Sequence, residues 1–346
     1  MDKVGIGVIG CGAIGRIHME RFQKVPNAQV VAVADVDQAA LDRAKAEYGV
    51  SKAYQDYGDL LARKDVDAVS VCLPNFLHCP VTVDAFEAGK HVLCEKPTAT
   101  HADEAIRMIE AGEKAGRKLM IGLCQRFNGS SQVLKAHIES GELGEIYYAK
   151  CGYLRRSGIP GMGGWFTTQA QSGAGPIYDI GVHALDLTLW LMDNFDPESV
   201  LAMSYAKFGP AGKGSGGWAT PVPGGPFDVE DLAAGLIRMK NGAAVFLEVS
   251  WAAHVGAGSF HSTLLGDKAG ADFGSMTIFA EEHGNFVDKK LHAPQRDNYL
   301  DEMKHFVGCI TEDKPPLTTK TQIIGVQKAL DGILDSAKAG EAVKLS

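Results

Sequence analysis

Apolar runs and helical patterns alternate along the first 123 residues. The apolar runs predict buried strands at Val4–Ile9, Val30–Ala34, Ala68–Leu73, His91–Cys94 and Lys118–Leu123. The segments between them have a helical pattern, at Arg16–Lys24, Gln38–Tyr48, Asp59–Arg63, Val81–Ala88 and Ala102–Ala115. Strands that alternate with helices predict a parallel, doubly wound sheet. Such a sheet binds its ligand at the carboxyl ends of its strands.

The pattern changes near Asn128. Strand-like alternation without intervening helices follows at Ile146–Tyr153, Ser199–Phe208, Leu232–Met239 and Ala243–Trp251. Helices are expected at Ser131–Ser140, Asp179–Leu191, Asn298–Thr311 and Thr321–Ala339. We therefore expect an α/β protein with a Rossmann domain at 1–123 and a second α/β domain at 124–346, built on an open, largely antiparallel sheet. Seven glycines and four prolines in Phe208–Phe227 predict a loop, either a mobile lid or a plain excursion.

Composition supports this organisation and excludes several classes of protein. A chain of 346 residues favours two domains, and 45% hydrophobic with 22% charged residues is typical of a soluble globular protein. The net charge of −8 argues against a nucleic-acid partner. No apolar run approaches the ~20 residues of a membrane span, and no signal peptide is expected. Seven scattered cysteines without a CxxC pair favour a reducing, cytoplasmic compartment and do not predict a zinc site.

The first strand turns sharply into a helix at Gly10-Cys11-Gly12-Ala13-Ile14-Gly15. Asp35 ends the second strand, 20 residues after Gly15. This is the dinucleotide fingerprint in its structural context, with a glycine turn, a helix N-terminus for the pyrophosphate and an acid for the ribose. Asp37 adds negative charge, and no basic residue follows before Arg43. We therefore expect NAD as the cofactor, with NADP as the alternative.

Three polar clusters follow consecutive strands, at Pro74-Asn75, Glu95-Lys96-Pro97 and Gln125-Arg126. Lys96 is the candidate of greatest chemical interest, because Pro97 fixes the direction of the backbone beside it. Glu95 is placed to pair with Lys96 or to orient it. The alternative is an ordinary solvated Lys–Glu pair.

Asp179 and His183 form a second cluster. Four residues apart on a helix, they would share one face, and a carboxylate that holds one imidazole nitrogen leaves the other to accept a proton. The alternative is a helix cap by Asp179 and a buried structural His183. Asp186 adds a third potential ligand at metal-binding spacing, but carboxylate-rich helices are common and we expect no metal.

Two longer runs resemble signatures of one family. CLPNFLHCPVTVDAFEAGKHVLCEKP and SGAGPIYDIGVHALDLTLWLM are similar to segments of the glucose–fructose oxidoreductase, inositol dehydrogenase and rhizopine-catabolism family (Gfo/Idh/MocA). The resemblance implies a set of cofactor-binding residues: Gly10, Gly12, Ala13, Ile14, Gly15, Asp35, Pro74, Asn75, His78, Glu95 and Lys96. It also implies catalytic roles for Lys96, Asp179 and His183. SGAGP departs from the GGG of many members, which affects packing near the nicotinamide.

The resemblance further implies hydride transfer between nicotinamide and a secondary alcohol of a sugar, sugar derivative or cyclitol. His183, oriented by Asp179, would take the hydroxyl proton, while Lys96 would hold the same oxygen. The active site would lie in the cleft between the domains. Burial of the open sheet face against a second subunit would give a dimer or tetramer.

Substrate contacts and alternative functions complete the prediction. Tyr153 and Trp165 suit stacking on a sugar ring, with core packing as the alternative role. Arg126, Arg155 and Arg156 suit sugar hydroxyls, a carboxylate or a phosphate. Other reactions consistent with these motifs are ketosugar reduction, glycoside processing by transient oxidation, and redox cycling on a retained cofactor. A non-catalytic dinucleotide-binding regulator would not need both Lys96 and His183.

Overall fold

The computed structural model describes residues 3–345, and the chain divides into two compact units. The first comprises Met1–Cys124 and Asp297–Ile323, and the second comprises Gln125–Arg296 and Ile324–Ser346. The predicted boundary at residue 123 is therefore one residue from the observed one. The assignment of all later residues to the second domain is wrong for Asp297–Ile323.

The first unit contains a six-stranded parallel sheet in the order β3-β2-β1-β4-β5-β6. Its strands are β1 (Val4–Ile9), β2 (Ala28–Ala34), β3 (Lys52–Tyr54), β4 (Ala68–Val71), β5 (His91–Cys94) and β6 (Leu119–Ile121). Every residue of β1 and β4 is buried, which explains why these strands are continuously apolar. The predicted Rossmann domain is confirmed. The short edge strand β3 was not predicted.

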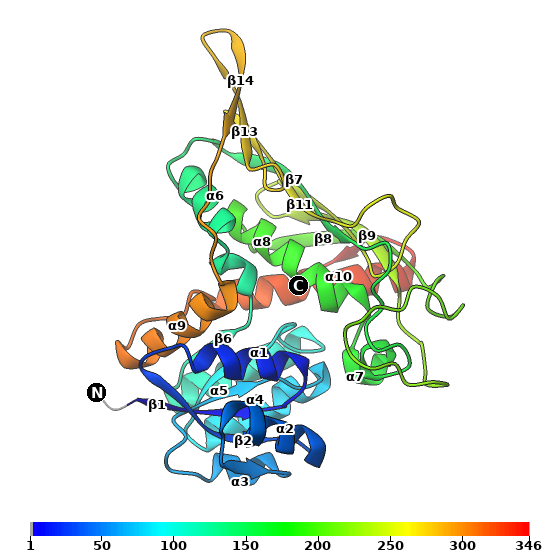
Figure 1. The fold of residues 1–346 in the computed structure, drawn as a ribbon. Coiled ribbons are helices and arrows are strands. Elements are labelled where there is room, and N and C mark those ends of the chain that lie inside the picture. The colour runs from blue at the N-terminus through cyan, green and yellow to red at the C-terminus, as the bar shows by residue number, and fades with distance from the viewer. Residues whose placement is uncertain (1–2, 346) are drawn as a thin grey trace. The chain divides into compact units, whose positions relative to one another are not determined.

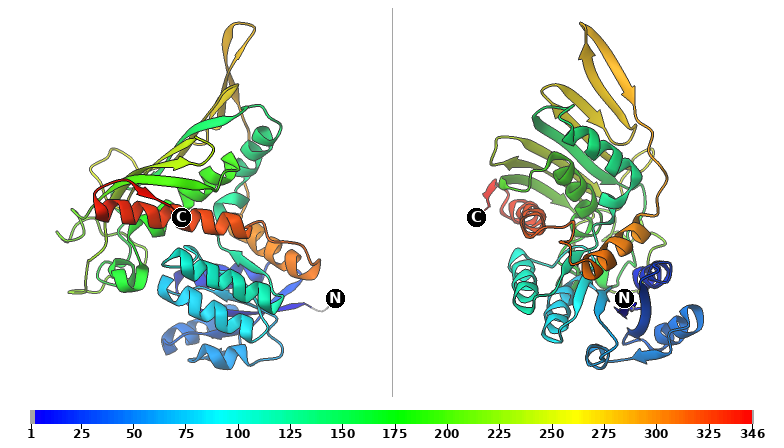
Figure 2. Two further views of the ribbon diagram at one scale, coloured as in Figure 1. Left: turned by 180° about the vertical axis from the view of Figure 1, so that it is seen from behind. Right: turned by 90° about the vertical axis from the view of Figure 1, so that its left-hand side faces the viewer.

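Helices cover both faces of this sheet. They are α1 (Ala13–Phe22), α2 (Gln38–Tyr48), α3 (Tyr57–Leu61), α4 (His78–Glu87) and α5 (Ala102–Ala115). Figure 1 shows α1 in front of the sheet, and the view from behind in Figure 2 shows α4 and α5 on the opposite face. The bounds of α2 and α5 match the prediction because Gly49 and Gly116 end them in left-handed conformations. Helix α1 begins three residues earlier than expected, inside the glycine turn.

Helix α9 (Asn298–Thr311) packs on α1, which is why it belongs to the first unit. Tyr299 approaches His18 with ring centroids 6.3 Å apart, and Arg21 pairs with Asp297 at 3.1 Å. The helix itself was predicted correctly. Its unit was not, because an amphipathic pattern does not identify the surface against which a helix packs.

The second unit is built on a nine-stranded sheet in the order β14-β13-β12-β11-β7-β10-β9-β8-β15. Only the β7·β10 pair is parallel among the described strands of this sheet. The strands are β7 (Ile146–Leu154), β8 (Pro197–Tyr205), β9 (Leu232–Met239), β10 (Ala244–Ser250), β11 (Ser259–Gly266), β12 (Ala269–Asp272), β13 (Thr277–Glu282), β14 (Asn285–Lys290) and β15 (Val343–Lys344). The expected open, largely antiparallel sheet is confirmed, although β11–β14 and β15 were not predicted.

Helices cover one face of this sheet. Helices α6 (Gly129–Glu139), α8 (Val182–Met192) and the later part of α10 (Lys320–Ala339) lie on that face, while the hairpin β13–β14 projects at one end (Figures 1 and 2). Helix α8 is almost wholly buried and has no polar face, as expected of a core helix. In residues 3–345 no helix is long and apolar enough to cross a membrane.

The opposite face of the sheet exposes apolar side chains. On β8 the inward residues Val200 and Ala202 alternate with Leu201 and Met203, which are 48% and 59% exposed. The other large apolar side chains exposed on this face are Tyr205, Leu236, Leu265, Phe279 and Phe286. An apolar sheet face of this extent is unusual for a surface that stays in water.

The glycine- and proline-rich segment 208–227 is attached to residues 158–164. The Ile159 N–H donates to the Gly214 carbonyl at 2.8 Å, and the Gly216 N–H donates to the Ile159 carbonyl at 2.8 Å. The N–H of Val222 bonds to the Met162 carbonyl, also at 2.8 Å. The loop prediction is therefore correct, and the loop has regular backbone partners.

Candidate functional site

The glycine turn before α1 combines two close-packed positions with one open position. A Cβ on Gly10, whose φ is +96°, would lie 2.2 Å from the Cys72 carbonyl oxygen, and one on Gly15 would lie 1.9 Å from the Gly10 carbonyl oxygen. A Cβ on Gly12 would meet nothing within 4 Å. Gly12 is also the N-cap of α1 and provides no side-chain cap. The turn therefore offers open space beside the N–H groups of a helix N-terminus, which fits the pyrophosphate of a dinucleotide.

Asp35 connects this turn to the end of β2. One carboxylate oxygen accepts the N–H of Cys11 at 2.7 Å, and the other accepts the N–H of Asp37 at 2.8 Å. The side chain is half-buried, and each oxygen retains a lone pair for a further donor. Asp37 caps α2 through Ala39 N–H, and its carboxylate lies 3.9 Å from the Arg43 guanidinium. Arg43 thus approaches closer to this acidic pair than the sequence suggested.

His78 joins two loops at the carboxyl ends of the strands. Its Nδ1 lies 2.7 Å from the Pro97 carbonyl oxygen, and its Nε2 lies 2.9 Å from that of Leu73. The residue is fully buried, and burial lowers the pKa of its imidazole. The loops that contain Pro74-Asn75 and Lys96-Pro97 are thereby held together. Direct contact between His78 and a cofactor stays a prediction.

A buried polar network beneath Lys96 was missed by the sequence analysis. His18, on α1, lies 2.7 Å from Ser70 Oγ through Nδ1 and 2.9 Å from Glu95 Oε1 through Nε2. The second carboxylate oxygen of Glu95 accepts the Lys96 N–H at 3.2 Å. A histidine three residues after Gly15, on the apolar face of a helix, gave no sign of its partners in distant strands.

His18 and Glu95 form an ion pair when the imidazole is protonated. Burial favours the neutral forms of both groups, but the hydrogen bond from His18 keeps the pKa of Glu95 below its usual value. Burial likewise opposes charge on His18, yet Cys72 and Glu95 raise the pKa of the imidazole well above 6.5. These two shifts favour an imidazolium–carboxylate pair directly behind the Lys96 backbone. Glu95 is therefore not part of a solvated surface pair.

Asp179 and His183 lie at the start of the buried helix of the second unit. Asp179 is in a π-helical turn (Ile177–Gly181), and His183 is the second residue of α8. The two residues therefore do not lie on one regular α-helix, as the prediction of a shared face assumed. Asp179 is also not the cap of a helix, because it lies inside the π-helical turn. A π-helical turn often marks a functional site because it changes the direction of side chains along the helix.

Asp179 is bound by a tryptophan that the sequence analysis did not identify. The indole Nε1 of Trp251, directly after β10, donates to Asp179 Oδ2 at 2.8 Å. Glu230 supports the same turn, because its carboxylate accepts the N–H groups of Gly175 at 3.0 Å and Ile177 at 3.1 Å. Burial raises the pKa of Glu230 to about 7, although these two hydrogen bonds act to lower it. Asp179 thus lies in a rigid, partly buried surrounding.

Arg126 is held inside the second unit by an acidic partner, and its contact with substrate stays a prediction. Its side chain is fully buried, and its guanidinium makes a bidentate pair with Asp186 at 3.0 and 2.6 Å. It also lies 5.4 Å from the centre of the Phe195 ring. The same pair occupies Asp186, so this carboxylate is not available as the third ligand of the metal site considered above. In residues 3–345 no cluster of three potential metal ligands occurs.

The remaining substrate candidates lie in the second unit and are accessible. Tyr153 is half-buried, with the Arg155 guanidinium 4.6 Å above its ring. Trp165 stacks on Phe166 with ring centroids 3.7 Å apart. Arg156 is exposed and donates to the Gly256 carbonyl at 3.4 Å. Contact of these side chains with a sugar stays a prediction.

Comparison with known proteins gives two family matches. Residues 4–123 match the model described as "Oxidoreductase family, NAD-binding Rossmann fold", and residues 131–272 match the "GFO/IDH/MocA C-terminal domain".

Individual relatives are similar along nearly the whole chain. D-Glucoside 3-dehydrogenase of Escherichia coli K12 is 31% identical over 98% of this chain and 97% of its own length. Myo-inositol 2-dehydrogenase of Thermotoga maritima is 29% identical over 90% of this chain and 89% of its own. The solved structure of a levoglucosan dehydrogenase with NADH and levoglucosan matches with a TM-score of 0.86 and 21% identity, over 99% of this chain and 100% of that one. This last likeness concerns the fold.

Proposed function

Because the chain belongs to the Gfo/Idh/MocA family of oxidoreductases, we propose that it is an NAD-dependent dehydrogenase of a sugar, sugar derivative or cyclitol. The glycine turn carries this proposal, since its open Gly12 and uncapped helix N-terminus suit a dinucleotide. The substrate class is supported by relatives named as glucoside and inositol dehydrogenases.

The cofactor would be held by the first unit. Gly10, Gly12 and Gly15, with Ala13 and Ile14, would surround the pyrophosphate, and Asp35 would accept hydrogen bonds from the adenosine ribose. The loops at Pro74-Asn75 and Glu95-Lys96, held together by His78, would contact the nicotinamide end. NAD bound there would supply the hydride acceptor for oxidation of a secondary alcohol.

The protein's own groups would manage the proton and the developing negative charge. His183 would accept the hydroxyl proton as the carbon–hydrogen bond breaks. Asp179, fixed by Trp251, would orient the imidazole and stabilise the imidazolium that forms. Lys96, whose backbone is fixed by Glu95, would donate a hydrogen bond to the reacting oxygen. Tyr153 and Trp165 would stack on the sugar ring.

A screen of sugars, glucosides and cyclitols with NAD tests this function by the absorbance of the reduced cofactor. At least one member should be oxidised with saturation kinetics. NAD binding without oxidation of any of them, and without reduction of the matching keto compounds by NADH, would contradict the proposal.

The seven cysteines are all free and buried, which suits the cytoplasm as the place of action.

The enzyme should prefer NAD to NADP by at least about tenfold in kcat/KM. The reason is that Asp35 and Asp37 would repel a 2′-phosphate, and Arg43 neutralises only part of their charge. Steady-state kinetics with both cofactors measures the ratio of kcat/KM for NAD to that for NADP, and a preference for NADP would overturn the prediction. Asp37→Asn should narrow the ratio while preserving the helix cap. Asp42→Asn, which removes the same charge one helical turn further along, should leave the ratio unchanged.

We also propose that the apolar face of the nine-stranded sheet is buried against a second copy of the chain. The exposed side chains of β8, together with Leu236 and Phe279, support an interface on this face. Sedimentation at micromolar concentration should show a dimer or tetramer. Met203→Lys should shift the protein toward the monomer, whereas Val36→Lys, at an 85% exposed site of the first unit, should not. A monomeric wild-type protein would contradict the assembly.

A further inference from the structure

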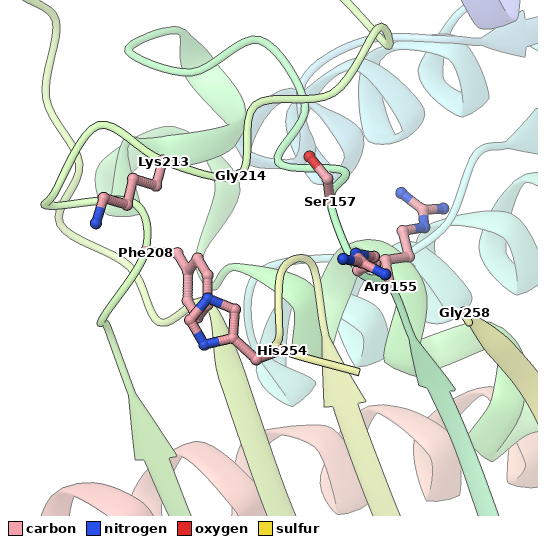
Figure 3. A pocket seen from close by; sticks show the side chains of 8 residues that line it. Arg155, Ser157, Phe208, Lys213, Gly214, His254 and Gly258 are labelled. Atoms are coloured by element: carbon pink, nitrogen blue, oxygen red, sulfur yellow. The ribbon is translucent and has the colours of Figure 1, made fainter. Parts of the chain in front are cut away.

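A surface pocket of about 560 Å³ lies within the second unit (Figure 3). It is formed where β7 and β10 end and where the segment 208–227 begins. The side chains relevant to its chemistry are Arg155, Arg156, Ser157, Phe208, Lys213 and His254. Of the three arginines considered for substrate binding, Arg155 and Arg156 line this pocket and Arg126 does not.

The pocket is positively charged in a protein whose net charge is −8. Arg155, Arg156 and Lys213 line it, and none of the lining residues is acidic. Within residues 3–345, none of these three side chains forms an ion pair. Arg155 and Arg156 each make one long hydrogen bond, to the carbonyl oxygens of Gly158 at 3.5 Å and Gly256 at 3.4 Å. Each guanidinium has five N–H donors, so most of them remain for a ligand.

Arg155 is fixed in place before any ligand arrives. Its N–H donates to the Ser250 carbonyl at 2.9 Å, its own carbonyl accepts the Ala253 N–H at 3.0 Å, and its guanidinium stacks on Tyr153. Phe208 packs edge-on against His254 with ring centroids 4.9 Å apart, and the two rings lie side by side in Figure 3. The pocket therefore combines cationic groups with an aromatic wall. This combination suits a polar ring that carries an anionic group.

The pocket is connected to the proposed catalytic groups through Trp251. This residue follows β10 and donates to Asp179, while a Cβ on Gly158 would lie 3.4 Å from its carbonyl oxygen. Gly158 belongs to the turn that continues directly from Arg155 and Arg156. Because β7 and β10 run parallel, their carboxyl ends meet at the same edge of the sheet. Asp179 and the basic pocket thus share that edge.

We propose that this pocket binds the anionic group of the substrate, a phosphate or a carboxylate carried by the sugar. Arg155, Arg156 and Lys213 line the pocket without an acidic residue among its lining, and a phosphate or carboxylate would compensate their charge and accept the paired N–H groups of arginine. The proposal rests on the proposed function and makes it more specific. The relevant substrates are sugar phosphates or sugar acids.

Binding tests the proposal independently of turnover. Calorimetric titration of the enzyme with NAD present should show glucose 6-phosphate or glucuronate binding at least about tenfold more tightly than glucose, with an affinity that falls as salt rises. Tight binding of the phosphate alone or of the carboxylate alone identifies the anion. Equal affinities for all three sugars would overturn the proposal, even if sugars are oxidised.

Substitutions of residues that line the pocket test whether the anionic group binds there. Arg156→Gln combined with Lys213→Gln should weaken binding of the anionic sugar about 10- to 100-fold and remove most of its preference over the neutral sugar. Lys338→Gln, which removes a positive charge at an exposed site near the end of α10, should leave the affinities for both sugars unchanged. In kinetics the loss should appear in KM and not in kcat, because the anion contributes equally to ground-state and transition-state binding. An unchanged preference in the double variant would place the anion elsewhere and overturn the proposal.

The two proposals fail in different ways. If the anionic sugar binds as expected and no sugar is ever oxidised, the dehydrogenase function fails and the pocket stands. If neutral and anionic sugars are oxidised equally well by every variant, the function stands and the pocket fails.

Discussion

Replacing His183 with alanine should lower the turnover number by a factor on the order of 10² to 10⁴ at neutral pH. The loss is expected because oxidation of an alcohol requires a base for the hydroxyl proton. NAD affinity should change little, since the dinucleotide would be held by the glycine turn and Asp35. Lys96→Met should cause a comparable loss, because it removes a hydrogen bond to the oxygen that becomes negative. Asp179→Asn should be milder if the carboxylate only orients the ring.

Single-turnover hydride transfer, NAD affinity and thermal midpoint, measured on the same variants, separate catalysis from structure. His137→Ala is a matched control, because it removes a half-buried imidazole that pairs with Glu142 in the same unit. It should retain near-normal turnover. A purely structural His183 would give a His183→Ala protein that melts earlier and transfers hydride normally. Normal single-turnover rates in both His183→Ala and Lys96→Met would reject the catalytic assignment.

Replacing His18 with leucine should destabilise the protein by about 3 to 5 kcal/mol, because the change leaves the buried Glu95 carboxylate without its cationic partner. In a unit of this size that corresponds to a fall of roughly 6 to 20 °C in thermal midpoint. Removing both charges in His18→Leu/Glu95→Leu should cost less than the sum of the single changes, since no unpaired charge remains. Strictly additive single effects would show that the two groups do not interact.

The stabilisation by this pair should depend on pH in a defined way. The pKa of Glu95 is lowered from 4.5, so its contribution to folding stability is fully present above pH 4.5. This contribution is lost as the pH falls through the lower pKa of the folded state. The pKa of His18 is raised from 6.5, so its contribution to folding stability is fully present below pH 6.5. This contribution is lost as the pH rises through the higher pKa of the folded state. The difference in stability between wild type and His18→Leu should therefore be largest between pH 4.5 and 6.5. A difference that is constant from pH 3 to 9 would contradict a charged pair.

The parts of the fold that the sequence predicted depend on local patterns. The strands of the parallel sheet are apolar throughout because both faces are buried, and helices α2 and α5 end at glycines that adopt positive φ. Strands β13 and β14 were not predicted because most of their residues are exposed and little apolar alternation remains. The unit to which α9 belongs depends on its contact with α1, and no residue of α9 encodes that partner.

The same distinction applies to the candidate site. The glycine turn and Asp35 lie within one stretch of chain, so spacing alone identified them. Arg126 and His18 owe their roles to partners 60 and 77 residues away, Asp186 and Glu95, and spacing gave no indication of either. The π-helical turn at Asp179 contains one more residue per turn than the pattern assumed, and Trp251 reaches Asp179 from 72 residues away.

The two hydrogen bonds of Asp35 restrict how the nucleotide preference of this enzyme can be redesigned or can drift during evolution. Its carboxylate accepts the N–H of Cys11 inside the glycine turn and that of Asp37 at the start of α2. A small apolar side chain at position 35 would remove the repulsion of a 2′-phosphate but would also leave two backbone donors without their acceptor. Asparagine has one acceptor oxygen for these two donors, so it could retain only part of this support. A lineage that moves toward NADP is therefore expected to change the neighbouring turn together with this residue, through paired substitutions and not single ones.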